Sequence, residues 1–214
     1  MEITHIGHSC FLIKGKKVSL VVDPYNPEIT GFKMPKQTAK ILLNTHDHED
    51  HSFNKQVNFD RLINTPGEFE IDDVYITGIP TFHDNKEGEE RGKNIVFQIE
   101  IEGISIVHLG DLGHELNEKS ISKMGKVDVL LIPVGGHYTI DAFVASKVIS
   151  SLEPAIVIPM HYRSEDSSQK DLDDVSKFLH EMGVSNPEKL DSLKITTPES
   201  DEKETRIIIL NQDH

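Results

Sequence analysis

Short apolar runs rich in β-branched residues recur along most of the chain, and Gly, Pro, Asn or Asp bounds most of them. This pattern is typical of β-strands. It predicts strands at residues 3–7, 10–14, 17–22, 41–44, 61–64, 74–82, 94–101, 105–108, 127–132, 155–159 and 206–210.

Helical spacing of apolar residues is rarer. The clearest helix is predicted at residues 140–152, with Thr139 or Asp141 as its N-cap. A second helix is predicted at 168–182 and a weaker one at 117–124.

The order of these elements predicts the fold class. Early strands in meander order, followed by alternating strands and helices, predict an α/β (or α+β) protein with helices outside its sheets. No shift in composition and no Gly/Ser-rich linker divides the 214 residues, so we expect a single domain over 1–214. The charged or irregular stretches 24–40 and 84–93 are predicted surface loops, which either overhang a site or are simply solvated.

Cysteine content and hydropathy exclude several classes of protein. Cys10 is the only cysteine, which excludes an internal disulfide framework and a cysteine-rich zinc module. No apolar run approaches the length that spans a bilayer, and the first residues lack the basic and apolar regions of a signal peptide. We therefore expect a cytoplasmic protein with no membrane contact.

The chain is strongly acidic, with 22 basic and 36 acidic residues and a formal net charge of −14. This charge disfavours a nucleic-acid partner, because phosphate contacts need a positive surface. It does not exclude a small anionic substrate, since bound divalent ions would create a local positive centre. We expect a small-molecule substrate, and a homo-oligomer remains open.

The densest cluster of candidate chemistry follows the predicted strand at 41–44. Residues 46–51 read His46-x-His48-x-Asp50-His51, so three imidazoles and a carboxylate lie within six residues. Neutral imidazole and carboxylate are the ligands that zinc and similar divalent metals favour. A turn at the end of a rigid strand can fan such ligands around metal ions, so the run predicts a metal site.

Three further polar residues directly follow predicted strands: His83, Asp111 and His161. Ligands at strand ends are held by the sheet and project from one rim, as a preorganised site requires. We therefore expect these side chains to join the 46–51 run. A structural zinc site is the alternative, but such sites use four closed ligands, often including Cys.

Longer motifs extend this pattern. They read Ile6-Gly7-His8-Ser9, Leu109-Gly110-Asp111-Leu112-Gly113-His114, Pro133-Val134-Gly135-Gly136-His137-Tyr138-Thr139 and Pro159-Met160-His161-Tyr162. The candidate ligands and these motifs occur in the order found in the metallo-β-lactamase fold hydrolases, which the chain therefore resembles. It resembles more closely the short prokaryotic branch that includes the ascorbate-6-phosphate lactonases. The resemblance covers about residues 3–210 and implies a four-layer αββα sandwich with metals at one edge of the sheets. It does not identify a substrate, because one scaffold serves many reactions.

The resemblance also implies two sets of metal ligands joined by a bridge. The first set is His46, His48 and His83, the second is Asp50, His51 and His161, and Asp111 bridges them. Zinc is the first expectation for the two divalent ions, and manganese or iron suits the same ligand types. The predicted catalytic residues are Asp50, which would also orient the nucleophile, Asp111 and His114.

Roles outside the ligand sets are less defined. His114 is predicted to donate a proton to the leaving group or to support a metal ligand, and a surface histidine without a role is the alternative. His8 either faces the metals or binds backbone. His137 and Thr139 open a predicted helix, whose N–H groups would meet an anionic substrate, although capping explains Thr139 equally well. His108 is predicted to pack beside the sheet.

These features predict a metal-dependent hydrolase. A water shared by two ions would have its pKa lowered toward ~7, and the resulting hydroxide would attack a small ester, lactone or phosphodiester. Two alternatives stay open on the same ligands: a metal-binding sensor without turnover, and an iron-dependent oxidoreductase.

Overall fold

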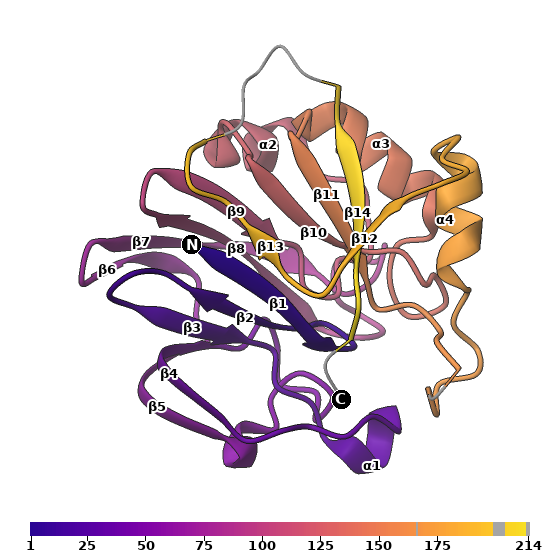
Figure 1. The fold of residues 1–214 in the computed structure, drawn as a ribbon. Helices are drawn as coiled ribbons and strands as arrows, with labels where there is room; N and C mark the ends of the chain where they lie inside the picture. Colours follow the sequence, from indigo (N-terminus) through magenta and orange to yellow (C-terminus); the bar gives the residue numbers. More distant parts are fainter. Residues whose placement is uncertain (166, 199–203, 213–214) are drawn as a thin grey trace.

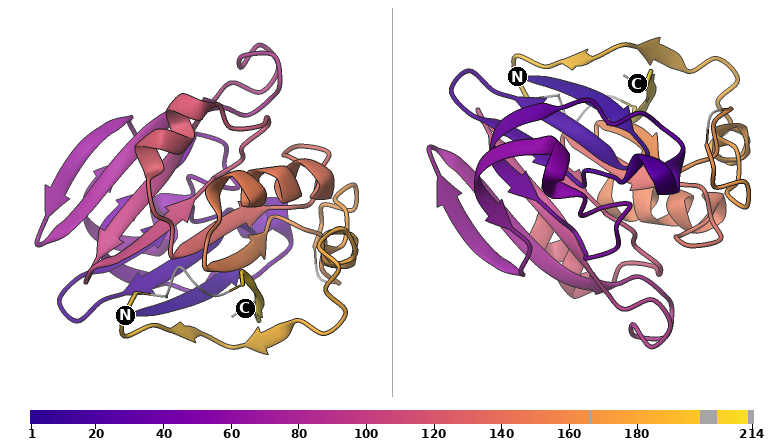
Figure 2. Two further views of the ribbon diagram at one scale, coloured as in Figure 1. Left: turned by 90° about the horizontal axis from the view of Figure 1, so that it is seen from above. Right: turned by 90° about the horizontal axis from the view of Figure 1, so that it is seen from below.

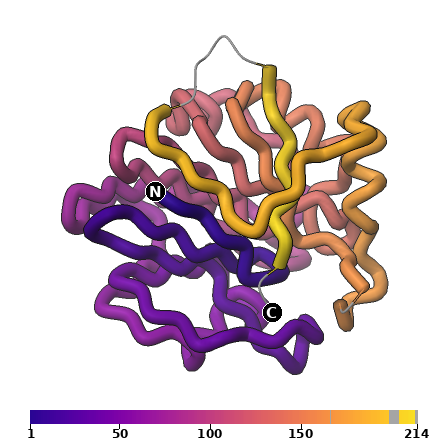
Figure 3. The backbone as a smooth tube through the Cα atoms, in the orientation of Figure 1, coloured from indigo at the N-terminus to yellow at the C-terminus, as the bar shows by residue number. Residues whose placement is uncertain are grey.

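The computed structural model describes residues 1–165, 167–198 and 204–212. Its two β-sheets pack face to face (Figure 1). The first sheet has the strand order β13-β1-β2-β3-β4-β5. Its strands are β1 (Glu2–Gly7), β2 (Cys10–Lys14), β3 (Ser19–Val22), β4 (Gln37–Leu43), β5 (Val57–Ile63) and β13 (Leu193–Lys194). The late strand β13 pairs with β1, so distant parts of the sequence lie side by side (Figure 3).

The second sheet has the order β12-β14-β11-β10-β9-β8-β7-β6. Its strands are β6 (Gly67–Ile71), β7 (Val74–Phe82), β8 (Lys93–Ile101), β9 (Ile104–His108), β10 (Val129–Pro133), β11 (Ile156–Met160), β12 (Glu188–Leu190) and β14 (Arg206–Leu210). The strands from β6 to β9 are antiparallel, whereas β9, β10, β11 and β14 run parallel.

Strand β8 illustrates how one strand serves two layers. Phe97 and Ile99 lie in the core between the sheets, whereas Val96 joins the apolar cluster under the helices. Gln98 is also buried and donates to the carbonyl of Met124 at 2.6 Å. Successive side chains point to opposite faces of a strand, so a strand covered on both faces reads as a nearly continuous apolar run.

Helices lie outside both sheets. The eight-stranded sheet is covered by α2 (Glu118–Met124), α3 (Ala142–Leu152) and α4 (Val175–Glu181) (Figure 2). The six-stranded sheet is covered by residues 24–36, which include α1 (Pro27–Thr30), and a single 3-10 turn, Asn54–Gln56, precedes β5. The predicted αββα arrangement is therefore confirmed, with one outer layer built mainly from irregular chain. Within the described ranges, no helix is long and apolar enough to cross a membrane.

One predicted helix is too long. The segment 168–182 forms turns up to Asp174, whose side chain caps α4 by accepting from the N–H of Ser176 at 2.8 Å. Asp173 is bonded on both sides by distant backbone, donating to Gly135 O at 2.8 Å and accepting from Arg163 N at 2.9 Å. These tertiary bonds take the place of helical ones. The prediction also missed β6, β12 and β13, which are short or polar edge strands, and α1 inside the predicted loop 24–40.

Candidate metal centre

The predicted ligands meet at one end of the sandwich. The 46–51 run follows β4, His83 follows β7, Asp111 lies just beyond β9 and His161 follows β11. Each side chain is thus placed by the carboxyl end of a strand, as the sequence pattern indicated.

Asp111 lies at the centre of this cluster. Its Oδ2 is 3.1 Å from Nε2 of His83, 3.2 Å from Nε2 of His161 and 3.9 Å from Nε2 of His46. Its Oδ1 is 3.2 Å from Nε2 of His51. One carboxylate therefore contacts side chains from both predicted ligand sets.

The ligand atoms form groups of a size that suits metal ions. One group is His46, His48 and His83, a second is His8, Asp50, His51 and His161, and a third is His46, His51 and Asp111; within each, the ligand atoms lie within 4.8 Å of one another. The first two groups match the sets implied by the resemblance, with His8 added to the second. The third joins them.

The donor chemistry fits cations. Nε2 of His46 is buried and lacks a hydrogen-bond partner in the part of the chain that the structure describes. Burying polar atoms without partners is costly, and metal coordination removes that cost. Burial lowers the pKa of His46 to about 3, which keeps the imidazole neutral and able to bind metal.

Asp23 supports the ligands and was not predicted from the sequence. It is fully buried at the end of β3, with φ of 50°. Its Oδ2 accepts from Nδ1 of His51 at 2.9 Å and from Oγ1 of Thr45 at 2.7 Å, while Oδ1 accepts from the Thr45 N–H at 2.8 Å. With a metal bound, this carboxylate would fix the tautomer of His51 and leave its Nε2 lone pair directed at the centre. Burial raises the pKa of Asp23, but the His51 bond and charge outweigh it, so the pKa lies below its usual value.

Asn94 holds the backbone of Asp111. Its Oδ1 accepts from the Asp111 N–H at 3.0 Å, and its Nδ2 donates to Thr81 Oγ1 at 2.8 Å and to Leu109 O at 2.9 Å. Gly110 has φ of 56°, and a Cβ there would collide with the Asn94 side chain. The Gly110-Asp111 pair is therefore required by close packing as well as by backbone conformation.

His8 is positioned by its own backbone. Its carbonyl accepts from His161 N at 3.1 Å and pairs with Nε2 of His5 at 2.9 Å. Its Nε2 lies 3.5 Å from Oδ2 of Asp50, and its ring centroid lies 4.2 Å from that of His161. His8 was predicted either to face the metals or to bind backbone, and in the structure its ring faces the cluster. Burial lowers the pKa of His8 to about 4, so the ring is neutral.

The structure does not bring His114 into the cluster. Its Nε2 accepts from the Phe82 N–H at 3.2 Å, and its Nδ1 lies 2.7 Å from the Glu115 carbonyl. Both ring nitrogens of His114 contact backbone, so neither is directed at the cluster as a proton donor. His108 behaves as predicted, with Nε2 2.9 Å from Ser9 O and Nδ1 accepting from Gly110 N at 3.0 Å.

A cavity of about 290 Å³ opens onto the cluster. Beside the candidate ligands, its wall includes Arg91, Tyr138 and Gln169. Gln169 donates from Nε2 to Oδ2 of Asp50 at 3.2 Å. The predicted substrate contacts His137 and Thr139 are not in this wall, although Tyr138 lies between them: His137 is exposed, and Thr139 donates to Ile140 O at 3.3 Å. Arg91 and Gln169 lie in irregular segments whose position the sequence pattern does not indicate.

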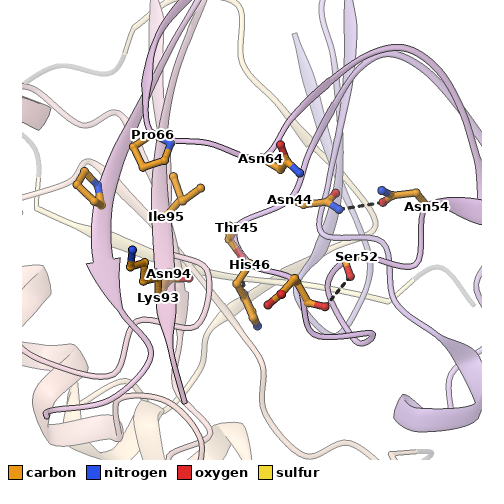
Figure 4. A pocket seen from close by; sticks show the side chains of 12 residues that line it. Asn44, Thr45, His46, Ser52, Asn54, Asn64, Pro66, Lys93, Asn94 and Ile95 are labelled. Atoms are coloured by element: carbon orange, nitrogen blue, oxygen red, sulfur yellow. Dashed lines mark hydrogen bonds between the residues drawn. The ribbon is translucent and has the colours of Figure 1, made fainter. Parts of the chain in front are cut away.

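His46 lines a different and larger cavity of about 670 Å³. Its wall is mostly neutral and polar (Figure 4), and Asn44 donates to Oδ1 of Asn54 at 3.1 Å within it. It contains one of the clustered ligands, His46, whereas the smaller cavity contains five. Cavity size therefore does not indicate the candidate metal site, whereas the grouping of donor atoms does.

Comparison with known proteins identifies the family to which the chain belongs. The sequence matches the profile of a beta-lactamase superfamily domain over residues 2–161. A UPF0173 metal-dependent hydrolase of Thermoplasma volcanium is 32% identical over 200 residues, which covers 80% of this chain and 87% of that relative. A second such hydrolase, from Thermoplasma acidophilum, is 29% identical over 197 residues, with the same coverage of 80% and 87%.

Solved structures of similar proteins support the same family assignment. The chain is similar to a metallo-beta-lactamase superfamily protein of Thermotoga maritima, with a TM-score of 0.80 and 36% identity over 98% of this chain and 97% of that one. Igni18, a metallo hydrolase of Ignicoccus hospitalis, gives a TM-score of 0.66 at 23% identity over 91% of this chain and 99% of that one, a likeness of fold alone.

Proposed function

Because this chain belongs to the β-lactamase superfamily and is a metal-dependent hydrolase, we propose that it cleaves a small ester, lactone or phosphodiester at a centre of two divalent ions, with zinc as the first candidate. The single observation that carries the two-ion proposal is the position of Asp111. Its two carboxylate oxygens lie 3.1–3.2 Å from imidazoles of both ligand groups. A carboxylate in that position offsets the repulsion between two cations.

Such ions, when bound, would supply an activated water at neutral pH and stabilise negative charge on a substrate oxygen. The residues of the chain position that chemistry. His46, His48 and His83 would hold one ion, and Asp50, His51 and His161 the other, with His8 beside the second group. Gln169 fixes Asp50 by donating to its Oδ2, and this carboxylate would both hold the second ion and orient a nucleophilic water.

Cys10 is not suited to act as a covalent nucleophile. Cys10 is fully buried in the core, and burial raises the pKa of its thiol well above the usual value. A buried neutral thiol is a poor nucleophile.

The test is a hydrolysis screen on protein reconstituted with zinc, manganese or iron, using 4-nitrophenyl esters, lactones and bis(4-nitrophenyl) phosphate. We expect turnover of at least one class, its loss on chelation, and its recovery when metal returns. Turnover that survives metal removal would contradict the proposal. Metal binding without turnover of any class would favour a sensor, and activity only with iron and a redox substrate would favour an oxidoreductase.

A further inference from the structure

Arg91 is the only lysine or arginine among the described residues that line the 290 Å³ cavity. Its guanidinium carbon lies 5.5 Å from the ring centroid of Tyr138, which lines the same cavity. An aromatic face supports a guanidinium by cation–π attraction and restricts its orientation. A positive group is therefore held at the wall of the reactive pocket in a chain whose net charge is −14.

The backbone of Arg91 is anchored to Asp84, next to the candidate ligand His83. Asp84, the residue after His83, accepts from Arg91 N at 2.8 Å and from Glu90 N at 3.0 Å through Oδ2. Its Oδ1 accepts from Lys86 N and Gly88 N, both at 2.8 Å. One carboxylate thus fastens the whole loop between β7 and β8 to the strand end that supplies a candidate ligand. This loop is preorganised for binding.

The charge of Arg91 has no carboxylate partner among the residues that the structure describes. The nearby Glu90 is paired with Lys86 at 2.6 Å instead. The pocket carboxylates Asp50 and Asp111 belong to the ligand groups. Because a guanidinium presents parallel N–H donors that match carboxylate and phosphate oxygens, an unpaired Arg91 in this wall is suited to an anion from the ligand.

We propose that Arg91, backed by Tyr138, binds a carboxylate or phosphate group of the substrate at a point away from the bond that is cleaved. The substrate is then a small molecule with two polar ends, one directed at the ligand cluster and one at Arg91. The cavity volume of about 290 Å³ is at the small end of the range for small-molecule sites, which fits a compact metabolite. This inference rests on the proposed function, since it places the cleaved bond at the metal ligands.

The test measures binding rather than turnover. Glutarate and 4-phosphonobutyrate each carry two anionic ends, whereas butyrate carries one, and their affinities for the zinc-loaded protein are measured by calorimetry. We expect glutarate or 4-phosphonobutyrate to bind wild type about tenfold or more tightly than butyrate. Arg91→Gln should reduce that ratio to about twofold or less, and Arg91→Lys should retain part of it.

Lys86→Gln is the matched control, because it removes the same charge from the same loop at a side chain that pairs with Glu90 outside the cavity wall. It should leave the ratio unchanged, and thermal unfolding should show that each variant is folded. An equal affinity of wild type for the ligands with one and two anionic ends would overturn the inference, as would a full ratio in Arg91→Gln or an equal loss in Lys86→Gln.

The experiments distinguish failure of anion recognition by Arg91 from failure of the proposed hydrolase function. Arg91-dependent binding without turnover of any ester or phosphodiester would refute hydrolysis of those classes and support anion recognition. Turnover without an Arg91-dependent preference would refute anion recognition and leave the hydrolase proposal intact.

Discussion

Replacing Asp23 by Asn tests whether a buried carboxylate sets the protonation of a metal ligand. Asp23 accepts hydrogen bonds through both oxygens, and one of them comes from Nδ1 of His51. In Asp23→Asn, an oxygen kept at the Oδ1 position still accepts from the Thr45 N–H, and the amide NH2 takes the Oδ2 position, where it faces Oγ1 of Thr45 and the His51 ring. His51 must accept through Nδ1 and carry its proton on Nε2, the atom directed at Asp111.

The size of the effect follows from this tautomer change. Loss of the group that orients a ligating histidine costs about 10–100-fold in metal affinity, which equals about 1.4–2.7 kcal/mol. Stability of the metal-free protein should fall by a further ~1–3 kcal/mol, because buried polar groups lose partners. Zinc affinity is measured by competition with a chromophoric chelator, and stability by urea unfolding of the metal-free protein.

Asp128→Asn provides the control. Asp128 is also buried and accepts from the Ser105 N–H at 2.9 Å, but it belongs to none of the groups that could hold a metal. It should lower stability and leave zinc affinity unchanged. Wild-type zinc affinity in Asp23→Asn, or an equal loss in Asp128→Asn, would refute the reasoning.

Further predictions follow from other contacts. His114→Ala removes two backbone contacts and should lower stability by about 1–2 kcal/mol in thermal unfolding, with kcat within about threefold of wild type; a hundredfold loss of kcat would restore the proton-donor role. Gly110→Ala should destabilise by about 1–3 kcal/mol or more, since it adds strain and a collision with Asn94; a neutral change would contradict that packing. Asp84→Ala should speed hydrogen exchange over residues 84–92 and weaken glutarate binding, and unchanged exchange would show that Asp84 does not order the loop.

The sequence was most informative where local pattern and chemistry coincide. The strand-end positions of His83, Asp111 and His161 follow from apolar runs that stop at a polar residue, and the carboxyl ends of parallel strands share one edge of a sheet. The resemblance carried by these motifs is confirmed at the level of the superfamily and of a metal-dependent hydrolase.

The sequence was least informative where position depends on tertiary contacts. Asp23 stands before Pro24 after a strand, which reads equally well as an ordinary turn, and its role appears only through contact with His51. Arg91 reaches the pocket because Asp84 folds its loop, and residues 168–174 leave the helical path because distant backbone bonds them. Local propensity contains none of this information.

Metal content per chain is the most direct test of the central claim that Asp111 joins two metal-ligand groups. Elemental analysis of protein purified without added metal or chelator, followed by zinc reconstitution, should give about two equivalents for wild type. Asp111→Ala should hold clearly fewer, and Asp128→Asn should match wild type. A single equivalent in wild type, or two equivalents that persist in Asp111→Ala, would contradict the bridged two-metal centre.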